Sequence, residues 1–418
     1  MVAFLIDKIT PRWEYTFDFI FGQRGIDFKL YDDFKTFDES KGVKHQLSCS
    51  CGKILREQSI FSGNIESGTW ENQIVLTFDD QIDVLSSIFY VLTRMEEYQN
   101  DQWDNHGRFV GAESWQFKNG VLDQTICDRW AVAFIEFVEK ETKAKLDFDI
   151  SFVQIIPTFD IDNAFAYKYK TGSRRFLSKA KDLVQGNKVR LEERAQVLSG
   201  KLKDPYDGYG KILSTANTFT TRIFWLVGDY GKTDFNIAIE TPEIGKLICD
   251  LGENSSIGIH PSYRSNSELA LLKKEMGRME KVTKRKTLTS RQHFLKLRFP
   301  ETYHALLKND LSEDFTMGFA DQIGFRNGTA RSFPWFDLSI NERTDLLIRP
   351  FAYMDGSLNE YLKLSTDEAK KSIEKLFLEV EKYGGDFIFI WHNETITDHG
   401  IWKGWSSVLD FTLSLKKK

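Results

Sequence analysis

Short apolar runs alternate with charged amphipathic stretches from residue 150 onward, and no other feature of this chain constrains its fold as much. Residues 268–282 and 366–384 carry apolar side chains at helical spacing, whereas the runs between such stretches have the length and the β-branched content of strands. Strands that alternate with helices predict βαβ units and a parallel sheet. Seven repeats of this unit predict an α/β fold with a closed or nearly closed barrel of the (β/α)7 type. The seven expected strands fall within residues 155–162, 221–229, 255–262, 286–294, 314–319, 345–355 and 386–393.

Residues 1–150 show a weaker form of this alternation and predict a smaller α/β accessory domain, which places the barrel in residues 151–418. The polar cluster DNHGRF in the accessory domain contains His106 and Arg108, and is interpreted as a structured loop rather than a site. No other segment of this domain has the pattern of a catalytic site. The expected strands are residues 2–6 and 73–78, and the expected helices are residues 81–98 and 128–141.

The composition argues against several classes of partner. The 418 residues include 56 Lys and Arg against 61 Asp and Glu, and the net charge of −5 favours neither nucleic acid nor an anionic membrane as the main partner. Four cysteines in a chain of this length indicate a reducing compartment. The N-terminal apolar run is too short for a signal peptide, and no stretch approaches the roughly 20 apolar residues of a membrane span. We therefore expect a cytoplasmic protein, whose basic insertion near residues 168–203 is the candidate for peripheral membrane contact.

Polar side chains gather at the C-terminal ends of the expected strands. Asp160 and Asp162 end the first strand two positions apart, so they face the same side and repel each other unless a cation or a shared proton separates them. The C-terminal ends of the strands of a β/α barrel converge on the face where catalysis is sited. We therefore expect four further residues to join the two aspartates: His260, Arg291, His293 and His392.

This set of residues has two interpretations. Taken singly, each residue also fits a structural role, since an aspartate caps helices, a buried histidine bonds a carbonyl group, and Arg291 forms a surface salt bridge. Taken together, two carboxylates, three histidines and an arginine on one face favour a metal centre with a general acid and a general base. One aspartate would bind the cation while the other stays ionised beside it. Carboxylate and imidazole ligands suit zinc or another first-row divalent metal.

The order of these residues resembles the motif series of the polysaccharide deacetylase superfamily, whose members are metal-dependent enzymes that remove N-acetyl groups from amino sugars. The resemblance covers residues 150–410. The segment TFDID, residues 158–162, is similar to the Thr-Phe-Asp-Asp motif of that family. The likeness implies Asp160 as the general base and Asp162 as a metal ligand, although Ile161 separates them here.

Three further segments carry the resemblance. IHPSYR implies His260 as a metal ligand, RQHF implies that Arg291 orients the base, and FIWH implies His392 as the general acid. The chain departs from the family at Arg264, which stands where a second ligand histidine is expected. It departs again at His293, which replaces the proline of the third motif. His293 lies near the same face, and we infer that it is a substitute third ligand.

The resemblance implies a metal-dependent hydrolase, with Zn²⁺ as the expected cofactor, that removes N-acetyl groups from an amino-sugar glycan or a glycan precursor. A glycan-binding relative without catalysis is the alternative, favoured by Arg264 because it places a positive charge where a ligand belongs. A different metal-dependent hydrolase, acting on another amide or ester, is a third interpretation. The sequence leaves the sugar, the role of the accessory domain and the oligomeric state open.

Overall fold

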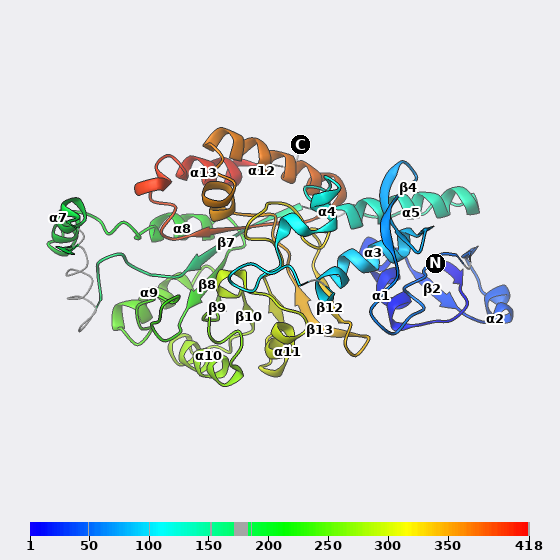
Figure 1. The fold of residues 1–418 in the computed structure, drawn as a ribbon, viewed down its shortest axis with the longest axis horizontal. Coiled ribbons are helices and arrows are strands. Elements are labelled where there is room, and N and C mark those ends of the chain that lie inside the picture. Colours follow the sequence, from blue (N-terminus) through cyan, green and yellow to red (C-terminus); the bar gives the residue numbers. More distant parts are fainter. Residues whose placement is uncertain (49, 100, 151–152, 171–182, 185, 417–418) are drawn as a thin grey trace.

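The computed structural model describes residues 1–416 with the exception of residues 49, 100, 151–152, 171–182 and 185. Two regions follow each other along the chain, an N-terminal region of residues 1–143 and a C-terminal region that starts at residue 153 (Figure 1). Figure 1 shows the small N-terminal sheets at one end of the molecule and the long parallel sheet of the C-terminal region beside them.

The N-terminal region holds two three-stranded sheets and five α-helices among its described residues. Its strands are β1 (Val2–Leu5), β2 (Phe28–Tyr31), β3 (Val43–Gln46), β4 (Ile65–Trp70), β5 (Gln73–Phe78) and β6 (Gln81–Ile82). Its helices are α1 (Pro11–Ile20), α2 (Phe34–Glu39), α3 (Val84–Leu92), α4 (Trp115–Lys118) and α5 (Ile126–Thr142). β1 pairs in parallel with β2 and β3, whereas β5 pairs antiparallel with β4 and β6. The helix expected over residues 81–98 is shorter than predicted, because its first two residues form β6 and its last turn is a 3₁₀ helix.

The C-terminal region is built on one nine-stranded sheet. Its strands are β7 (Val153–Ile161), β8 (Arg222–Leu226), β9 (Ser256–His260), β10 (Thr289–Ser290), β11 (Glu313–Asp314), β12 (Phe333–Asp337), β13 (Glu342–Ile348), β14 (Tyr353–Met354) and β15 (Gly385–His392). The order in the sheet is β12-β13-β11-β10-β9-β8-β7-β15-β14, and every neighbouring pair is parallel except β12 with β13.

This strand order bears on the predicted barrel. Apart from β12, the strands follow one another in chain order from β7 to β13, and β14 and β15 return to the other side of β7. This is the order of a β/α barrel that is interrupted between β13 and β14. Within the described residues no pairing closes the sheet, so the α/β class and the parallel sheet are confirmed while the closed barrel stays a prediction. The single strand expected over residues 345–355 is the end of β13 followed by β14, and the sequence pattern missed β12.

Helices lie between successive strands of the sheet, and one more helix follows β15. They are α7 (Lys188–Leu198), α8 (Tyr209–Ala216), α9 (Pro242–Leu251), α10 (Leu269–Thr283), α11 (Glu301–Lys308), α12 (Thr366–Tyr383) and α13 (Ser406–Ser414). The sequence predicted α10 and α12 to within one residue at each end. α12 starts where it does because Ser365 and Glu368 form a capping box, in which each side chain bonds the backbone N–H of the other. The middle of the predicted basic insertion, residues 171–182, lies outside the described residues.

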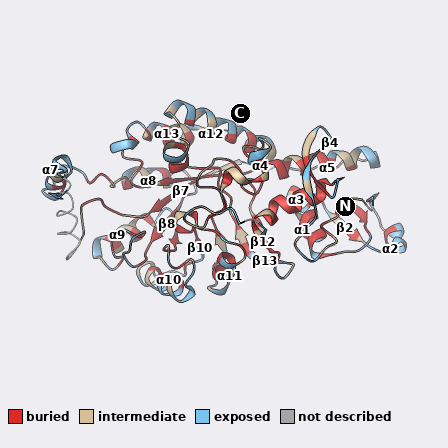
Figure 2. Ribbon diagram, viewed as in Figure 1, coloured by how far each residue is buried: buried red, intermediate tan, exposed pale blue. Residues whose placement is uncertain are grey.

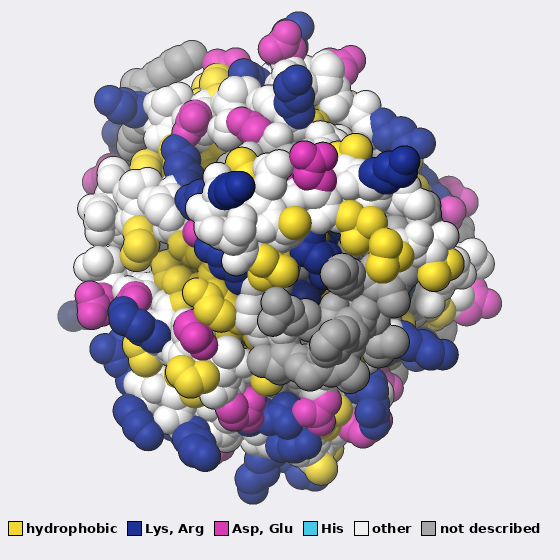
Figure 3. Space-filling model, turned by 90° about the vertical axis from the view of Figure 1, so that its left-hand side faces the viewer, with side chains coloured by type: hydrophobic (Ala, Val, Ile, Leu, Met, Phe, Trp, Pro, Cys, Tyr) yellow, Lys and Arg dark blue, Asp and Glu magenta, His cyan; other side chains and the backbone are white. Residues whose placement is uncertain are grey.

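Burial follows the layers of the fold. The strands of the long sheet are buried, whereas the outer faces of α9, α10 and α12 are exposed (Figure 2). Lys and Arg side chains are interspersed with Asp and Glu on the face seen in Figure 3. In the described part of the chain, every helix is too short or too polar to cross a lipid bilayer.

Candidate metal and acid–base site

The C-terminal edge of the parallel sheet carries the predicted site residues. In the register of the sheet Asp160 on β7 pairs with His392 on β15, and His260 is the last residue of β9. Asp162 and Arg291 directly follow β7 and β10. The backbone of the sheet alone therefore brings five of the predicted residues to one edge.

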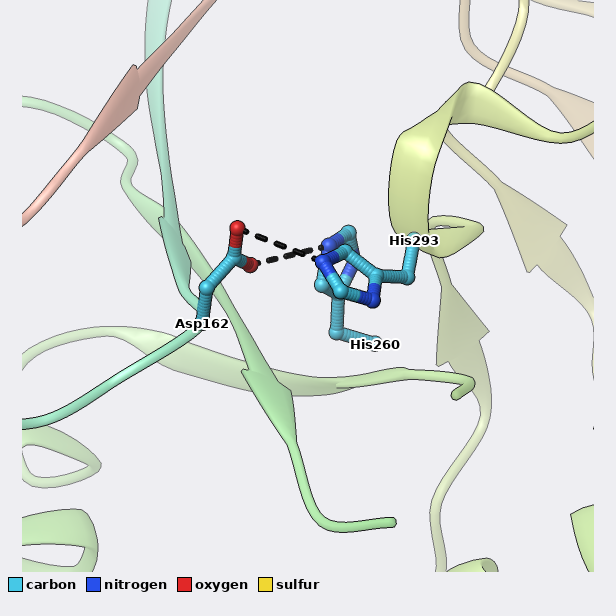
Figure 4. Close-up of side chains that lie close together, drawn as sticks. All are labelled: Asp162, His260 and His293. Atoms are coloured by element: carbon cyan, nitrogen blue, oxygen red, sulfur yellow. Dashed lines mark ion pairs between the residues drawn. The ribbon is translucent and has the colours of Figure 1, made fainter. Parts of the chain in front are cut away.

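Asp162, His260 and His293 form a cluster whose ligand atoms all lie within 4.8 Å of one another. Oδ1 of Asp162 is 3.2 Å from Nε2 of His260, and Oδ2 is 3.4 Å from Nε2 of His293. Figure 4 shows the carboxylate facing both imidazole rings. The three ligands that the sequence suggested are thus the three that the structure brings together.

The other ring nitrogen of each histidine in the cluster is already committed. Nδ1 of His260 lies 2.6 Å from the carbonyl oxygen of Arg291, and Nδ1 of His293 lies 2.8 Å from Oδ1 of Asp234. Because a carbonyl and an ionised carboxylate only accept hydrogen bonds, both Nδ1 atoms carry a proton and donate it. In each neutral ring, Nε2 then presents its lone pair toward Asp162. This is the arrangement of metal-ligating histidines, whose second nitrogen is held by an acceptor.

The cluster fits a divalent cation. Oδ1 of Asp162 is buried and accepts no hydrogen bond from the described residues. A buried carboxylate oxygen without a partner is costly, and a cation within reach would remove that cost. One carboxylate and two imidazoles that leave a further position open are the donor set of a catalytic zinc site.

The charges of the cluster shift its pKa values. Burial raises the pKa of Asp162, but the charge of His293 and the nearby imidazoles of His260 and His392 outweigh burial and hold this pKa well below its usual range. Burial lowers the pKa of His293, but Asp162 and Asp234 raise it to about 9. A proton on His293 therefore competes with a cation at neutral pH.

Asp160 is paired with Arg291 rather than with the cluster. Both side chains are buried, and Nη1 of Arg291 donates to Oδ1 of Asp160 over 2.7 Å. Oδ2 of Asp160 faces the cluster, 4.0 Å from Nε2 of His260. The repulsion between the two aspartates is therefore resolved separately, by Arg291 for Asp160 and by histidines for Asp162. The interpretation of Arg291 as a surface salt bridge is wrong, because its side chain is 0% exposed.

His392 faces the cluster from the end of β15. Its Nδ1 lies 2.8 Å from Oδ1 of Asp355, and its Nε2 lies 3.9 Å from Oδ2 of Asp162. Burial lowers the pKa of His392, but the charges of Asp355 and Asp162 raise it well above its usual range. The carboxylate of Asp355 also accepts hydrogen bonds from the backbone N–H of His392 and from the hydroxyl of Thr395, which fix both side chains. His392 is therefore a protonated donor beside the cluster.

A cavity of about 200 Å³ opens onto these groups. The residues that line it include Asp160, Asp162, His260, His293 and His392. Phe294, Tyr361 and Trp402 add aromatic surface, and Arg108, Glu360 and Glu394 add charge. Burial and the charge of Asp162 raise the pKa of Glu394 to about 7.

Arg264 and the large aromatic side chains of the C-terminal region differ in whether they lie near the site. The expectation that Arg264 occupies a ligand position is wrong, because its side chain is 69% exposed and pairs with Glu268 over 3.1 Å at the surface. Among the aromatic side chains on which a sugar ring could stack, Trp335 and Phe336 are buried in the core, whereas Trp402 lines the cavity.

Sequence reasoning missed three residues of the site. Asp355 directly follows β14 and could have been found by the same strand-end rule that found the others. Asp234 lies in the connection after β8, where no pattern marks it. Arg108 belongs to the DNHGRF cluster that was interpreted as a loop from the sequence, and its side chain lines the cavity.

Comparison with known proteins gives two results for the sequence. Residues 2–143 match the model of a family of unknown function (DUF7033). No curated protein matches the chain.

Solved structures with a similar arrangement of the chain include three with low identity. A protein from Mycobacterium smegmatis assigned as a polysaccharide deacetylase is 11% identical, with a TM-score of 0.40 over 64% of this chain and 86% of that one. Puue allantoinase is 10% identical, with a TM-score of 0.39 over 63% and 85% of the two chains. The polysaccharide deacetylase Bc1974 from Bacillus cereus is 9% identical, with a TM-score of 0.29 over 62% and 85%.

Proposed function

We propose that the chain is a metal-dependent hydrolase that removes N-acetyl groups from an amino-sugar glycan or glycan precursor. The observation that carries the proposal is the joint placement around one cavity of a three-ligand cluster, the Asp160 carboxylate held by Arg291, and His392 held by Asp355. Asp162, His260 and His293 would hold the cation, with Zn²⁺ as the first candidate. The motif resemblance of residues 158–162 and of FIWH supports the same assignment.

Each residue of the site has a separate role in the proposed reaction. When bound, a divalent cation would polarise the acetamide carbonyl and lower the pKa of a water molecule. Asp160 presents Oδ2 to accept the proton of the attacking water, and Arg291 holds the other carboxylate oxygen in place. His392 donates its Nε2 proton to the amide nitrogen as the C–N bond breaks, which releases acetate and a free amine.

The cavity suits a sugar ring with a nitrogen substituent. Trp402 and Phe294 offer apolar faces for stacking, whereas Glu360 and Glu394 offer carboxylates to sugar hydroxyls and to the amine that forms. A glycan precursor inside the cell would match the cytoplasmic location that we propose from the sequence. We keep a lipid-linked precursor, approached through the basic insertion, as a form of the same substrate.

The test is release of acetate by protein stripped of metal and reloaded with Zn²⁺, Co²⁺ or Ni²⁺. We expect acetate from N-acetylated amino-sugar oligomers with the reloaded wild type, released about 10²–10⁴-fold more slowly by Asp160→Asn loaded with the same metal. Acetate from O-acetyl esters alone would favour the hydrolase of another ester or amide. Binding of the oligomers by metal-loaded protein without any acetate release would contradict catalysis and favour a glycan-binding protein.

The binding-only alternative loses the feature that supported it. Arg264 does not place charge at the ligand position, because it pairs with Glu268 at the surface. The ligand position is filled by His293, whose ring is held by Asp234.

A further inference from the structure

The N-terminal region reaches the catalytic cavity through residues 101–109, here called the 101–109 loop. This loop lies against residues 294–299, the segment that directly follows His293. The guanidinium of Arg298 lies 4.7 Å from the ring of Trp103 in the loop. The two regions are therefore in contact beside one of the three candidate metal ligands.

The same segment makes a second aromatic contact with the N-terminal region. The rings of Tyr98 and Phe299 stack with centroids 5.5 Å apart and an interplanar angle of 15°. Both Tyr98 and Phe299 are largely shielded from solvent. The contact beside His293 thus continues along the segment as packing between the two regions.

Arg108 is the central contact between the loop and the site. Its Nη1 donates to the carbonyl oxygen of Phe294 over 2.9 Å, and its Nη2 donates to the hydroxyl of Tyr361 over 3.0 Å. Asp104 holds the guanidinium through Nε over 2.7 Å. The ring of His106 packs on that of Phe294, with centroids 4.7 Å apart. Arg108 is 8% exposed, so these bonds are shielded from water.

The turn that Arg108 holds has an unusual backbone. Phe294 and Leu295 are consecutive non-glycine residues with φ of 60° and 53°. L-residues rarely adopt this left-handed conformation, and it persists only where the surroundings over-determine it. The bond from Arg108 to the Phe294 carbonyl is such a restraint, placed one residue after His293.

We propose that the N-terminal region completes the metal and substrate site: Arg108 positions the 294–295 turn, and with it His293, and itself lines the cavity. This inference rests on the proposed function and deepens it. Arg108 is a positioning residue, since its contacts are with the protein and not with the metal. The N-terminal region, which matches a family of unknown function, would therefore shape the site of the C-terminal region.

The test compares Arg108→Ala with Arg129→Ala in the full-length protein. Arg129 is the matched control because it also joins the two regions, through Glu379 over 2.6 Å, but does not line the cavity. Both variants are titrated with Co²⁺, and the visible absorption of the bound cobalt reports the coordination geometry. Loss of a group that holds a metal ligand from outside typically costs about 10–100-fold in metal affinity. For Arg108→Ala we expect a loss of cobalt affinity near the lower end of this range and an altered cobalt spectrum. For Arg129→Ala we expect neither change.

Several outcomes overturn the proposal. Cobalt affinity and spectrum that match the wild type in Arg108→Ala would overturn the positioning role alone and leave the proposed function standing. Equal losses in Arg108→Ala and Arg129→Ala would assign the effect to general loosening between the regions. A wild type that binds no cobalt would overturn both this inference and the proposed function. If Arg108→Ala does not fold, Arg108→Lys replaces it, because it keeps one donor for the Phe294 carbonyl and should give a smaller change of the same kind.

Discussion

Glu97 and Asp162 are both shielded carboxylates with a lowered pKa, but they lie in opposite surroundings. Glu97 lies between the two regions of the molecule. Its Oε1 accepts from Nε of Arg94 over 2.6 Å and from Nε of Arg326 over 2.9 Å, and its Oε2 accepts from Nη2 of Arg326 over 2.5 Å. Asp162 instead faces histidine rings, and its Oδ1 accepts no hydrogen bond from the described residues.

The difference separates a structural carboxylate from a functional one. Arginine is a permanent cation, so Arg94 and Arg326 occupy both oxygens of Glu97 at every ordinary pH and leave no position for a ligand. Histidine is a conditional cation that becomes a metal ligand when it loses a proton. The partners of Asp162 can therefore exchange protons for a metal ion, whereas those of Glu97 cannot.

The largest expected effect is on metal binding in Asp162→Asn. An amide supplies no negative charge to the cluster, so we expect stoichiometric zinc binding to be lost, with a smaller loss of thermal stability than in Glu97→Gln. Elemental analysis of the two purified variants measures the first quantity and thermal unfolding the second. Full zinc content in Asp162→Asn would contradict the interpretation of Asp162 as a metal ligand.

Asp160→Asn separates catalysis from metal binding. Removal of a general base costs about 10²–10⁴-fold in rate, and we expect a loss of kcat in this range with zinc content unchanged. Acetate release at saturating substrate measures kcat. Unchanged kcat would assign Asp160 a structural role like that of Glu97.

Glu97→Gln tests whether Glu97 is a structural carboxylate. Removing one partner of a buried charge network costs about 3–5 kcal/mol, because charged groups are left buried and uncompensated. We expect a loss of unfolding free energy of that size in denaturant titrations, with zinc bound per folded molecule as in the wild type. A loss below about 1 kcal/mol, the level of an exposed ion pair, would contradict the account of Glu97.

Asp234→Asn tests whether the cluster depends on the residues behind it. Asp234 holds Nδ1 of His293, and loss of such a partner costs about 10–100-fold in metal affinity. Competition with a zinc-binding dye measures the affinity. Equal affinities of variant and wild type would show that the ring of His293 is held by other contacts.

Counted per pH unit, the smallest expected effect is the pH dependence of zinc affinity. His293 has a pKa raised to about 9 in the metal-free protein, and Nε2 must lose its proton to become a ligand. The affinity should therefore rise by about tenfold for each pH unit between pH 6 and pH 8, with about one proton released per zinc ion bound. Calorimetry in buffers of different ionisation enthalpy counts the protons, and an affinity independent of pH would contradict the shifted pKa.

The sequence predicted which polar residues lie close together more fully than it predicted the strands. Asp160, Asp162, His260 and His392 were found because strand ends converge in a parallel sheet, a rule that depends only on chain order. The sequence did not reveal β12, because an antiparallel edge strand breaks the alternation that located the others.

Sequence patterns did not predict contacts between segments that are far apart along the chain. Asp234 and Arg108 lie in loops, and their roles depend on hydrogen-bond partners 59 and 186 positions away along the chain. Arg264 was misjudged for the same reason, since motif spacing placed it at a ligand position while its side chain turns to Glu268. Spacing along a strand constrains the direction in which a side chain points, but spacing along a loop does not.

The metal content of the purified protein tests the central claim most directly. Wild-type protein freed of chelator and incubated with Zn²⁺, Co²⁺ or Ni²⁺ is analysed for bound metal beside His260→Ala. Our account predicts one equivalent of metal in the wild type and a large loss in His260→Ala. No bound metal in the wild type with any of the three ions would contradict the metal-dependent site on which the proposed function rests.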